Sequence, residues 1–316
     1  MVTILISFAL RQARKSSPSG EYCPMFDFNP GILGSVLPTL LKDRAAGRNI
    51  IFACEGQYEN ADFCTELTPD CLEKIMPRWL KSREQRDKRQ KKNAEVFTPA
   101  WLCNSMNNIV DSAWFGYENV FNTEKEKLWE TKKEKIAFPD GKTWKDYVLA
   151  RRMEITCGEA PYLTSRYDSV SGEIIDVGDR IGLFDRKLRI VSENISDEEE
   201  WLDYAQQALQ SVYGFEYQGD NLLIARCNML LALAEYFEKQ FSKGINLKYL
   251  EQSAEIISWN LWQMDGLTYR TPDSEFISVG RNAMKISECR GTSCIIYNWQ
   301  EDKQIVFADL AAENEQ

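Results

Sequence analysis

The fold of this chain is decided by one stretch, Tyr213-Gly214-Phe215-Glu216-Tyr217-Gln218-Gly219-Asp220-Asn221-Leu222-Leu223-Ile224. Residues 212–217 form a short apolar run, as expected of a buried strand. Over residues 220–241 the apolar side chains recur with the period of an α-helix. A strand that ends in an acidic residue and leads into a helix is typical of nucleotide-binding α/β folds, in which the carboxylate accepts hydrogen bonds from ribose hydroxyls.

The rest of the chain continues this alternation of helices and strands. Strands are predicted at 153–156, 212–217 and 257–263, with a hairpin of two strands at 294–297 and 304–307. Helices are predicted at 101–113, 144–152, 180–194, 198–210, 220–241 and 247–256. This order predicts an α/β fold with a mostly parallel sheet and helices on both faces.

The composition shift near residue 93 predicts two regions. Residues 1–92 are predicted to form an N-terminal extension whose first 30 residues lack regular structure, followed by a helix at 36–45, a strand at 49–53 and a basic helical segment at 77–93. Residues 93–316 are predicted to form the cofactor-binding domain.

Composition narrows the chemistry. The 316 residues contain no histidine, which excludes Ser-His-Asp and Cys-His nucleophile pairs and histidine metal sites. Nine cysteines, none spaced as Cys-x2-Cys, indicate a reduced cytoplasmic protein without a metal site. No apolar run approaches the roughly 20 residues that cross a bilayer, so no membrane partner is expected.

Three further stretches carry residues suited to a cofactor site. They are Glu95-Val96-Phe97-Thr98-Pro99, Glu154-Ile155-Thr156-Cys157-Gly158-Glu159-Ala160 and Gln263-Met264-Asp265-Gly266-Leu267. A glycine turn after a strand lets the backbone approach a ligand, and an acid after a strand accepts hydrogen bonds from it. Each stretch also has a purely structural interpretation, as a helix start at Thr98-Pro99 or as a turn at Cys157-Gly158 and Asp265-Gly266.

In this order the four stretches resemble the S-adenosylmethionine (SAM) half of adenine-N6 DNA methyltransferases from restriction–modification systems. The closer resemblance, from about residue 35 to the end, is to large single-chain methylases of these systems. It implies a Rossmann-like SAM-dependent methyltransferase fold with SAM as cofactor. By the resemblance, the cofactor-binding residues are Phe97, Thr98, Pro99, Glu154, Cys157, Gly158, Glu216 and Asp265.

Two features depart from the family pattern. Gly158 and Glu216 are about 58 positions apart, where roughly 20 are expected. The catalytic tetrapeptide of the family, Asn/Asp-Pro-Pro-Tyr/Phe, does not occur in the 316 residues, and in the related methylases it follows the stretch that matches this tail. The catalytic residues therefore stay unknown, the fold is predicted to be incomplete at its C-terminus, and the resemblance implies a downstream catalytic methylase segment or a restriction subunit as partner.

DNA is the second partner that the resemblance implies, and the basic segment 77–93 is the candidate surface for it. This segment carries eight Lys or Arg residues against two acidic residues, although the whole chain has a net charge of -10. Such a segment can contact phosphates, or it can be a solvated helix. The candidate phosphate contacts are Arg83, Arg86, Lys88, Arg89, Lys91 and Lys92.

Three functions remain open on the sequence. The first is an adenine-N6 DNA methyltransferase component that binds SAM. The second is a catalytically inactive, DNA-associated scaffold or specificity module that keeps the SAM-binding fold. The third is an α/β protein that uses another nucleotide such as NAD, which the missing Gly-x-Gly-x-x-Gly spacing disfavours.

Overall fold

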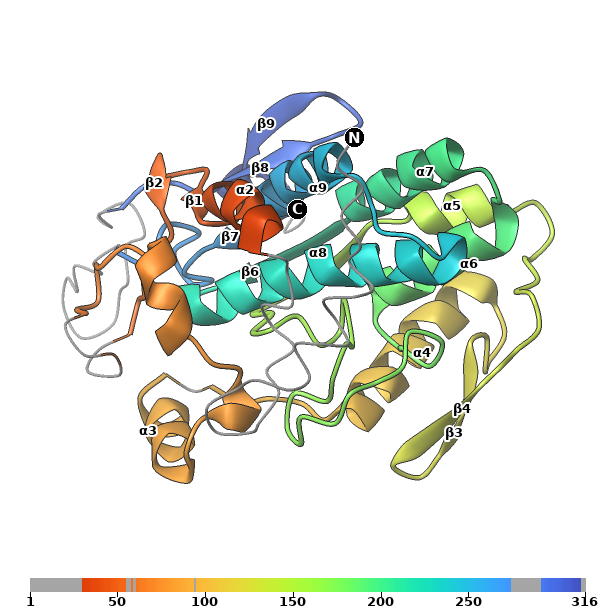
Figure 1. Cartoon of the computed structure of the whole chain (residues 1–316), viewed down its shortest axis with the longest axis horizontal. Coiled ribbons are helices and arrows are strands. Elements are labelled where there is room, and N and C mark those ends of the chain that lie inside the picture. The colour runs from red at the N-terminus through yellow and green to blue at the C-terminus, as the bar shows by residue number, and fades with distance from the viewer. Residues whose placement is uncertain (1–29, 55–57, 59–60, 94, 274–290, 314–316) are drawn as a thin grey trace.

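The computed structural model describes residues 30–54, 58, 61–93, 95–273 and 291–313; the predicted irregular start at 1–29 lies outside them. At its centre is a parallel sheet of β5 (Arg152–Glu154), β6 (Val212–Glu216) and β7 (Leu261–Gln263), in that order (Figure 1). The register pairs Glu154 with Gly214 and Glu216 with Gln263. The mixed α/β class is confirmed, although the parallel sheet is small.

Helices cover one face of this sheet. They are α6 (Leu183–Asn194), α7 (Glu198–Gln210), α8 (Gly219–Phe241) and α9 (Leu247–Asn260), joined by α5 (Trp144–Leu149) and α2 (Pro30–Leu40). Figure 1 shows α8 running in front of β6, and its side chains are buried along most of its length. The inward side chains of β6 and β7, Val212 and Leu261, belong to the same apolar cluster as these helices. The helical spans predicted between residues 101 and 256 are confirmed in outline. The helix predicted at 36–45 is wrong in its bounds, because α2 ends at Leu40 and the chain then turns into the hairpin of β1 (Lys42–Asp43) and β2 (Arg48–Asn49), which also replaces the strand predicted at 49–53.

The other face of the sheet, where helices were also predicted, carries a hairpin and one short helix. Tyr213, Phe215 and Trp262 pack there against an antiparallel hairpin, β8 (Ile295–Asn298) and β9 (Lys303–Val306), and against α10 (Phe307–Glu313). The hairpin was predicted at this place in the sequence. The strand predicted at 257–263 is shorter, because α9 continues to Asn260 and only the last residues pair with β6.

Buried apolar side chains from the described residues 30–92 share the core of the rest of the chain. β1 (Lys42–Asp43), β2 (Arg48–Asn49), the 3-10 helices η2 (Pro69–Lys74) and η3 (Arg78–Leu80), and α3 (Arg83–Asn93) precede the predicted boundary. Side chains such as Val36 and Phe52 belong to the cluster that holds the helices of the sheet. The amide of Gln263 in β7 also bonds both backbone groups of Ile51. The cofactor-site candidates therefore sit on one continuous packed body.

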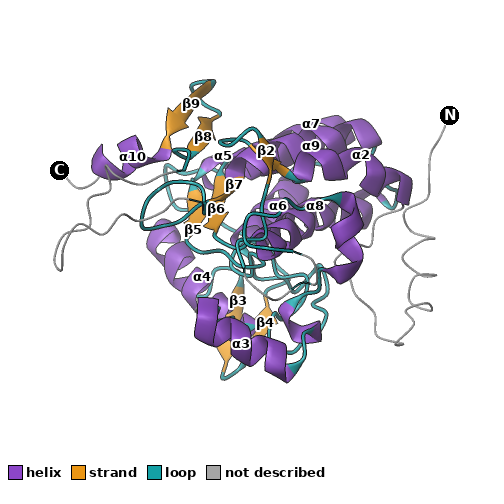
Figure 2. Ribbon diagram, turned by 90° about the vertical axis from the view of Figure 1, so that its left-hand side faces the viewer, coloured by secondary structure: helices purple, strands orange, loops and turns teal. Residues whose placement is uncertain are grey.

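The helix α4 (Ala100–Phe115) lies on the side of the molecule away from α9, next to the hairpin of β3 (Asn122–Lys125) and β4 (Leu128–Thr131) (Figure 2). Its buried face is polar. Asn104, Asn108 and Asp111 accept hydrogen bonds from the buried guanidinium of Arg186 in α6. These bonds use Nη1 and Nη2 of the guanidinium, whereas its buried Nε has no hydrogen-bond partner among the described residues. This arrangement ties α4 to α6.

Candidate functional site

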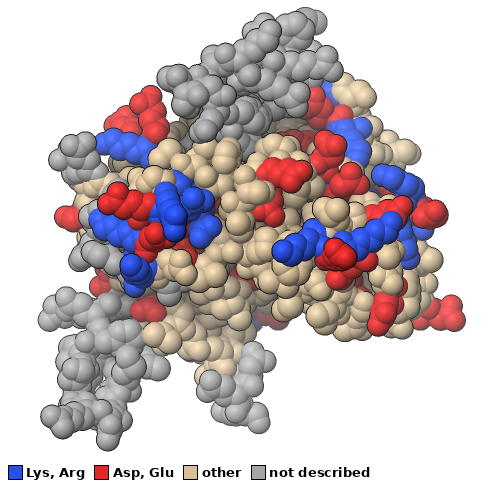
Figure 3. Space-filling model, turned by 90° about the horizontal axis from the view of Figure 1, so that it is seen from below, with Lys and Arg blue, Asp and Glu red and all other residues tan. Residues whose placement is uncertain are grey.

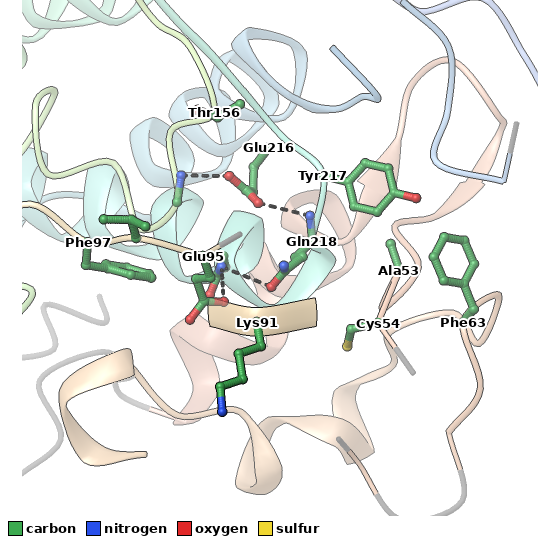
Figure 4. A pocket seen from close by; sticks show the side chains of 13 residues that line it. Ala53, Cys54, Phe63, Lys91, Glu95, Phe97, Thr156, Glu216, Tyr217 and Gln218 are labelled. Carbon is green, nitrogen blue, oxygen red and sulfur yellow. Dashed lines mark hydrogen bonds between the residues drawn. The ribbon is translucent and has the colours of Figure 1, made fainter. Parts of the chain in front are cut away.

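A cavity of about 860 Å³ opens at the carboxyl ends of β5 and β6 (Figure 4). Residues from four separate parts of the chain line it: Ala53, Cys54, Phe63, Lys91, Glu95, Val96, Phe97, Thr156, Gly158, Glu216, Tyr217, Gln218 and Asn221. In open parallel sheets the carboxyl ends of the strands are where ligands bind. The volume lies within the usual range of small-molecule sites.

Glu216 occupies the centre of this cavity. One of its carboxylate oxygens accepts the backbone N–H of Gly158 at 2.8 Å, and the other accepts the N–H of Gln218 at 3.1 Å. Burial raises the pKa of Glu216 to about 7, against the lowering effect of these two hydrogen bonds. A carboxylate offers about four acceptor positions, so two remain for donors on a ligand. The side chain is thus fixed in place and still able to accept a pair of hydroxyl groups.

The turn after β5 shapes one wall. Thr156, Gly158 and Ala160 have positive φ angles of 50°, 55° and 62°. For threonine and alanine this conformation costs about 1 kcal/mol or more each, and such strain gathers at functional sites. A Cβ at Gly158 would lie 3.6 Å from the Phe97 ring, so the ring packs close to the backbone of this glycine. The absence of a side chain on Gly214 lets Cys157 pack against the neighbouring strand.

A buried ionic network holds Glu95, one of the residues that line the cavity. Arg89 of α3, only 2% exposed, bonds the carboxylates of Glu95 and Asp220. Lys81 also contacts Asp220, at 3.3 Å. Burial would raise the pKa of Asp220, but the charges of Lys81 and Arg89 lower it below its usual value. This network clamps α3 and the segment before α4 onto the start of α8.

Aromatic side chains stand at the opposite end. The rings of Phe63 and Tyr217 meet edge to face with centroids 6.1 Å apart. Burial, reinforced by the charge of Asp265, raises the pKa of Tyr217 to about 12, so the phenol stays neutral. In Figure 4, Glu216 lies between this aromatic pair and Phe97. The cavity therefore has the aromatic pair at one end, the acidic Glu216 in the middle and the acidic Glu95 at the other end.

The structure brings together three of the eight predicted cofactor residues, namely Phe97, Gly158 and Glu216. The other five stand outside the lining. The carboxylate of Glu154 turns away and accepts the N–H groups of Tyr162 and Leu163, and burial raises its pKa well above the usual value. Its predicted contact with the ligand has no geometric support here.

The remaining predicted residues have local structural surroundings. Thr98 and Pro99 precede α4, where Pro99 occupies the position before the first helical turn. Cys157 is buried against Gly214. Asp265 accepts the backbone N–H of Leu267 in its own turn and reaches the site only through its charge on Tyr217.

The sequence prediction missed Glu95, Asn221 and Phe63 as lining residues. Glu95 lies two residues before Phe97 in a stretch already singled out, so its position in that stretch was the available signal. Asn221 follows the strand that ends at Glu216. Phe63 lies in an irregular segment that gives no sequence pattern, because only the fold brings it to the sheet.

The basic helix α3 borders the cavity but is less uniform than its sequence indicates. Arg83 is 91% exposed and Lys91 lines the cavity, while Lys88 is exposed and Arg86 half-buried. Arg89 must be removed from the candidate phosphate contacts, because it lies inside the protein bonded to Glu95 and Asp220. The side chain of Lys92 lies outside the described part of the structure. On the face seen from below, basic and acidic side chains are interspersed (Figure 3).

No protein-family model, no curated protein and no solved structure matches this chain. Among the described residues, no helix has both the length and the apolar character needed to cross a membrane. Within the same residues, no group of three or more Cys, Asp or Glu side chains is placed to hold a metal ion.

Proposed function

We propose that this chain binds SAM in the cavity at β5 and β6, as a component of an adenine-N6 DNA methyltransferase. The observation that carries the proposal is the position of Glu216, which is held by Gly158 and Gln218 at the centre of a cavity of about 860 Å³. In this arrangement the ribose hydroxyls donate to Glu216, and the adenine lies against Phe63 and Tyr217. The methionine end lies toward Phe97.

The charge of the cavity favours SAM over a dinucleotide. Among the lining residues that the structure describes, two are carboxylates, Glu95 and Glu216, and one is basic, Lys91. SAM carries a sulfonium and an ammonium, whereas the pyrophosphate of NAD is anionic and binds at a helix N-terminus that follows the glycine turn directly. After Gly158 the chain forms no helix until Leu183, and its N–H is already bonded to Glu216.

Methyl transfer needs groups that hold the target adenine outside the double helix. The tetrapeptide with this role in the resembling family does not occur in the sequence. The proposal for this chain is therefore cofactor binding, with the residues that hold the adenine supplied by a further methylase segment. The second candidate is a non-catalytic DNA-associated module, and it also rests on the missing tetrapeptide. It predicts that the chain binds SAM but transfers no methyl group, whichever methylase segment is added.

Isothermal titration calorimetry with SAM and NAD tests the proposal. The whole chain should bind SAM and show no heat with NAD. Glu216→Gln removes the charge while keeping the shape, and it should weaken SAM binding by about 10-fold or more, because hydrogen bonds to a charged acceptor contribute about 1.5–3 kcal/mol. Binding of NAD in preference to SAM, or unchanged SAM affinity in Glu216→Gln with the same melting temperature as wild type, would refute the assignment.

Transfer of a labelled methyl group to unmethylated DNA separates the two candidates. The assay contains this chain, SAM and a separately expressed methylase segment that carries Asn-Pro-Pro-Tyr. Label in adenine that depends on both proteins, and on Glu216, supports the methyltransferase component. SAM binding without transfer in this assay supports the non-catalytic module.

A further inference from the structure

One oxygen of the Glu95 carboxylate has no hydrogen-bond partner among the described residues. This oxygen, Oε1, is buried, and Glu95 lines the cavity with a side chain only 5% exposed. The other oxygen accepts from Arg89 and, at 3.1 Å, from the amide of Asn221. A buried carboxylate oxygen that accepts nothing carries an uncompensated desolvation cost. The side chain is therefore held firmly with one acceptor left over.

The surroundings of Glu95 select the charge of the donor that this oxygen can accept. The negative charge of Glu95 raises the pKa of the nearby Glu216, so the two carboxylates repel each other across the cavity. Arg89 divides its charge between Glu95 and Asp220. A cationic donor would form a hydrogen bond to Oε1 and would also reduce the repulsion between the two carboxylates. A neutral hydroxyl would form the hydrogen bond without reducing the repulsion.

The order of groups along the cavity identifies which part of a ligand reaches Glu95. Figure 4 places Glu95 beside Phe97, on the side of Glu216 away from Phe63 and Tyr217. With the ribose on Glu216 and the adenine on the aromatic pair, the amino-acid chain extends toward Glu95. Its α-amino group is protonated at neutral pH and provides three N–H donors.

We infer that Glu95 binds the α-ammonium of the ligand through Oε1. Glu154 has both oxygens directed at the N–H groups of Tyr162 and Leu163 and does not line the cavity. The inference rests on the proposed binding of SAM. It adds that the acid of the Phe97 segment, not the acid of β5, recognises the amino-acid end.

Three ligands separate this contact from the rest of the site. SAM carries the ammonium and the sulfonium, S-adenosylhomocysteine carries the ammonium alone, and 5′-methylthioadenosine carries neither. Calorimetry on the whole chain should show that Glu95→Gln weakens SAM and S-adenosylhomocysteine by about 10-fold or more, while 5′-methylthioadenosine changes by less than about 2-fold. The matched control Glu216→Gln should weaken all three ligands.

Any other pattern of affinity changes in Glu95→Gln overturns the inference. Unchanged affinities in Glu95→Gln, an equal loss for all three ligands, or a loss for SAM alone would each show that Glu95 does not bind the ammonium. If the wild-type chain binds none of the three, the proposed function itself fails, which differs from every pattern above. If Glu95→Gln does not fold, the wild-type chain is compared with S-adenosylhomocysteine and its desamino analogue. Equal affinities there would refute the contact, and an about 10-fold preference for the amine would support it.

Discussion

The carboxylate of Glu216 accepts the backbone N–H of Gly158 at 2.8 Å, although 58 positions separate the two residues. This bond joins the turn after β5 to the end of β6 in the lining of the cavity. It exists because parallel pairing of Glu154 with Gly214 brings the turn after one strand beside the last residue of the next. The segment between them folds as a loop followed by α6 and α7, so its length does not disturb the sheet.

Ligand binding should depend on pH through Glu216. Burial raises its pKa to about 7, and ribose hydroxyls donate to the ionised form. SAM affinity should therefore rise by about 10-fold between about pH 6 and pH 8 and then level off. Calorimetry at constant ionic strength should show this rise in wild type and a flat profile in Glu216→Gln. A wild-type profile without slope would show that the ionised carboxylate is not used.

The matched control for this profile is Glu159→Gln. Burial also raises the pKa of Glu159 to about 7, but Glu159 does not line the cavity. Its carboxylate accepts hydrogen bonds from Arg78 N–H and the Tyr167 hydroxyl. The variant should keep the pH dependence of binding, because that dependence belongs to Glu216.

The same two groups predict how unfolding depends on pH without ligand. Both carboxyls have a folded pKa of about 7 against a usual value of 4.5. A raised pKa contributes stability that is complete below about pH 4.5 and is lost as the pH rises through about 7, by roughly 3 kcal/mol for each group. Urea unfolding at about pH 5 and pH 8 should show this fall, to which Glu154 also contributes because burial raises its pKa. Glu159→Gln should remove only the part that belongs to Glu159 and leave the rest, and equal falls in both proteins would contradict the prediction.

Much of the fold could be predicted because its signals are local. The spans of α7 and α8 follow from helical periodicity, and the hairpin near the C-terminus follows from two short apolar runs. In α4 the local pattern does not predict which face of the helix is buried. Its apolar residues look like a buried face, yet Ile109 is 63% exposed while Asn104 and Asn108 are buried. The buried Arg186 on a distant helix decides this orientation, and no local pattern contains that partner.

The site was predictable where chain position fixes geometry. Glu216 ends β6 and Gly158 lies in the turn after β5, so parallel pairing of the two strands brings both residues to one edge of the sheet. The prediction placed Glu154 in the cofactor site, but its carboxylate accepts the N–H groups of Tyr162 and Leu163. Strand pairing fixes the position of the backbone and does not determine which donors a carboxylate binds. The charge run in α3 also could not show that Arg89 turns inward, because its partners Glu95 and Asp220 come from other segments.

Replacement of Gly219 should destabilise the fold. A Cβ at this position would stand 2.0 Å from the backbone oxygen of Ile51, and the Gly219 N–H bonds Phe52 at 3.2 Å. Gly219→Ala must push that segment away from α8, at about 1–3 kcal/mol. Gly34→Ala is the control, because nothing lies within 4 Å of its Cβ inside α2, and it should stabilise by about 0.5–1 kcal/mol. Urea denaturation measures both, and a neutral Gly219→Ala would show that the close contact relaxes freely.

The buried network should make Arg89 far more important for stability than Arg83. Arg89→Met leaves Glu95 without its cation and Asp220 with Lys81 alone, which should cost about 3–5 kcal/mol. Arg83→Met removes an exposed pair at 3.9 Å to Asp87 and should change stability by less than about 0.5 kcal/mol. Equal effects in chemical denaturation would mean that the network does not hold α3 in place.

DNA binding, if α3 contacts phosphates, should depend on its exposed basic residues and not on Arg89. Arg83→Ala and Lys91→Ala should each lower the slope of log affinity against log salt by about one, because each phosphate contact releases about one counterion. The effect should be the same for any duplex sequence, since phosphate contacts carry no base information. Fluorescence anisotropy over a salt series measures the slope. Lys125→Ala is the control, because Lys125 lies in the β3–β4 hairpin, away from the cavity, paired with Glu130. An equal slope in all three variants and wild type would place the DNA surface elsewhere.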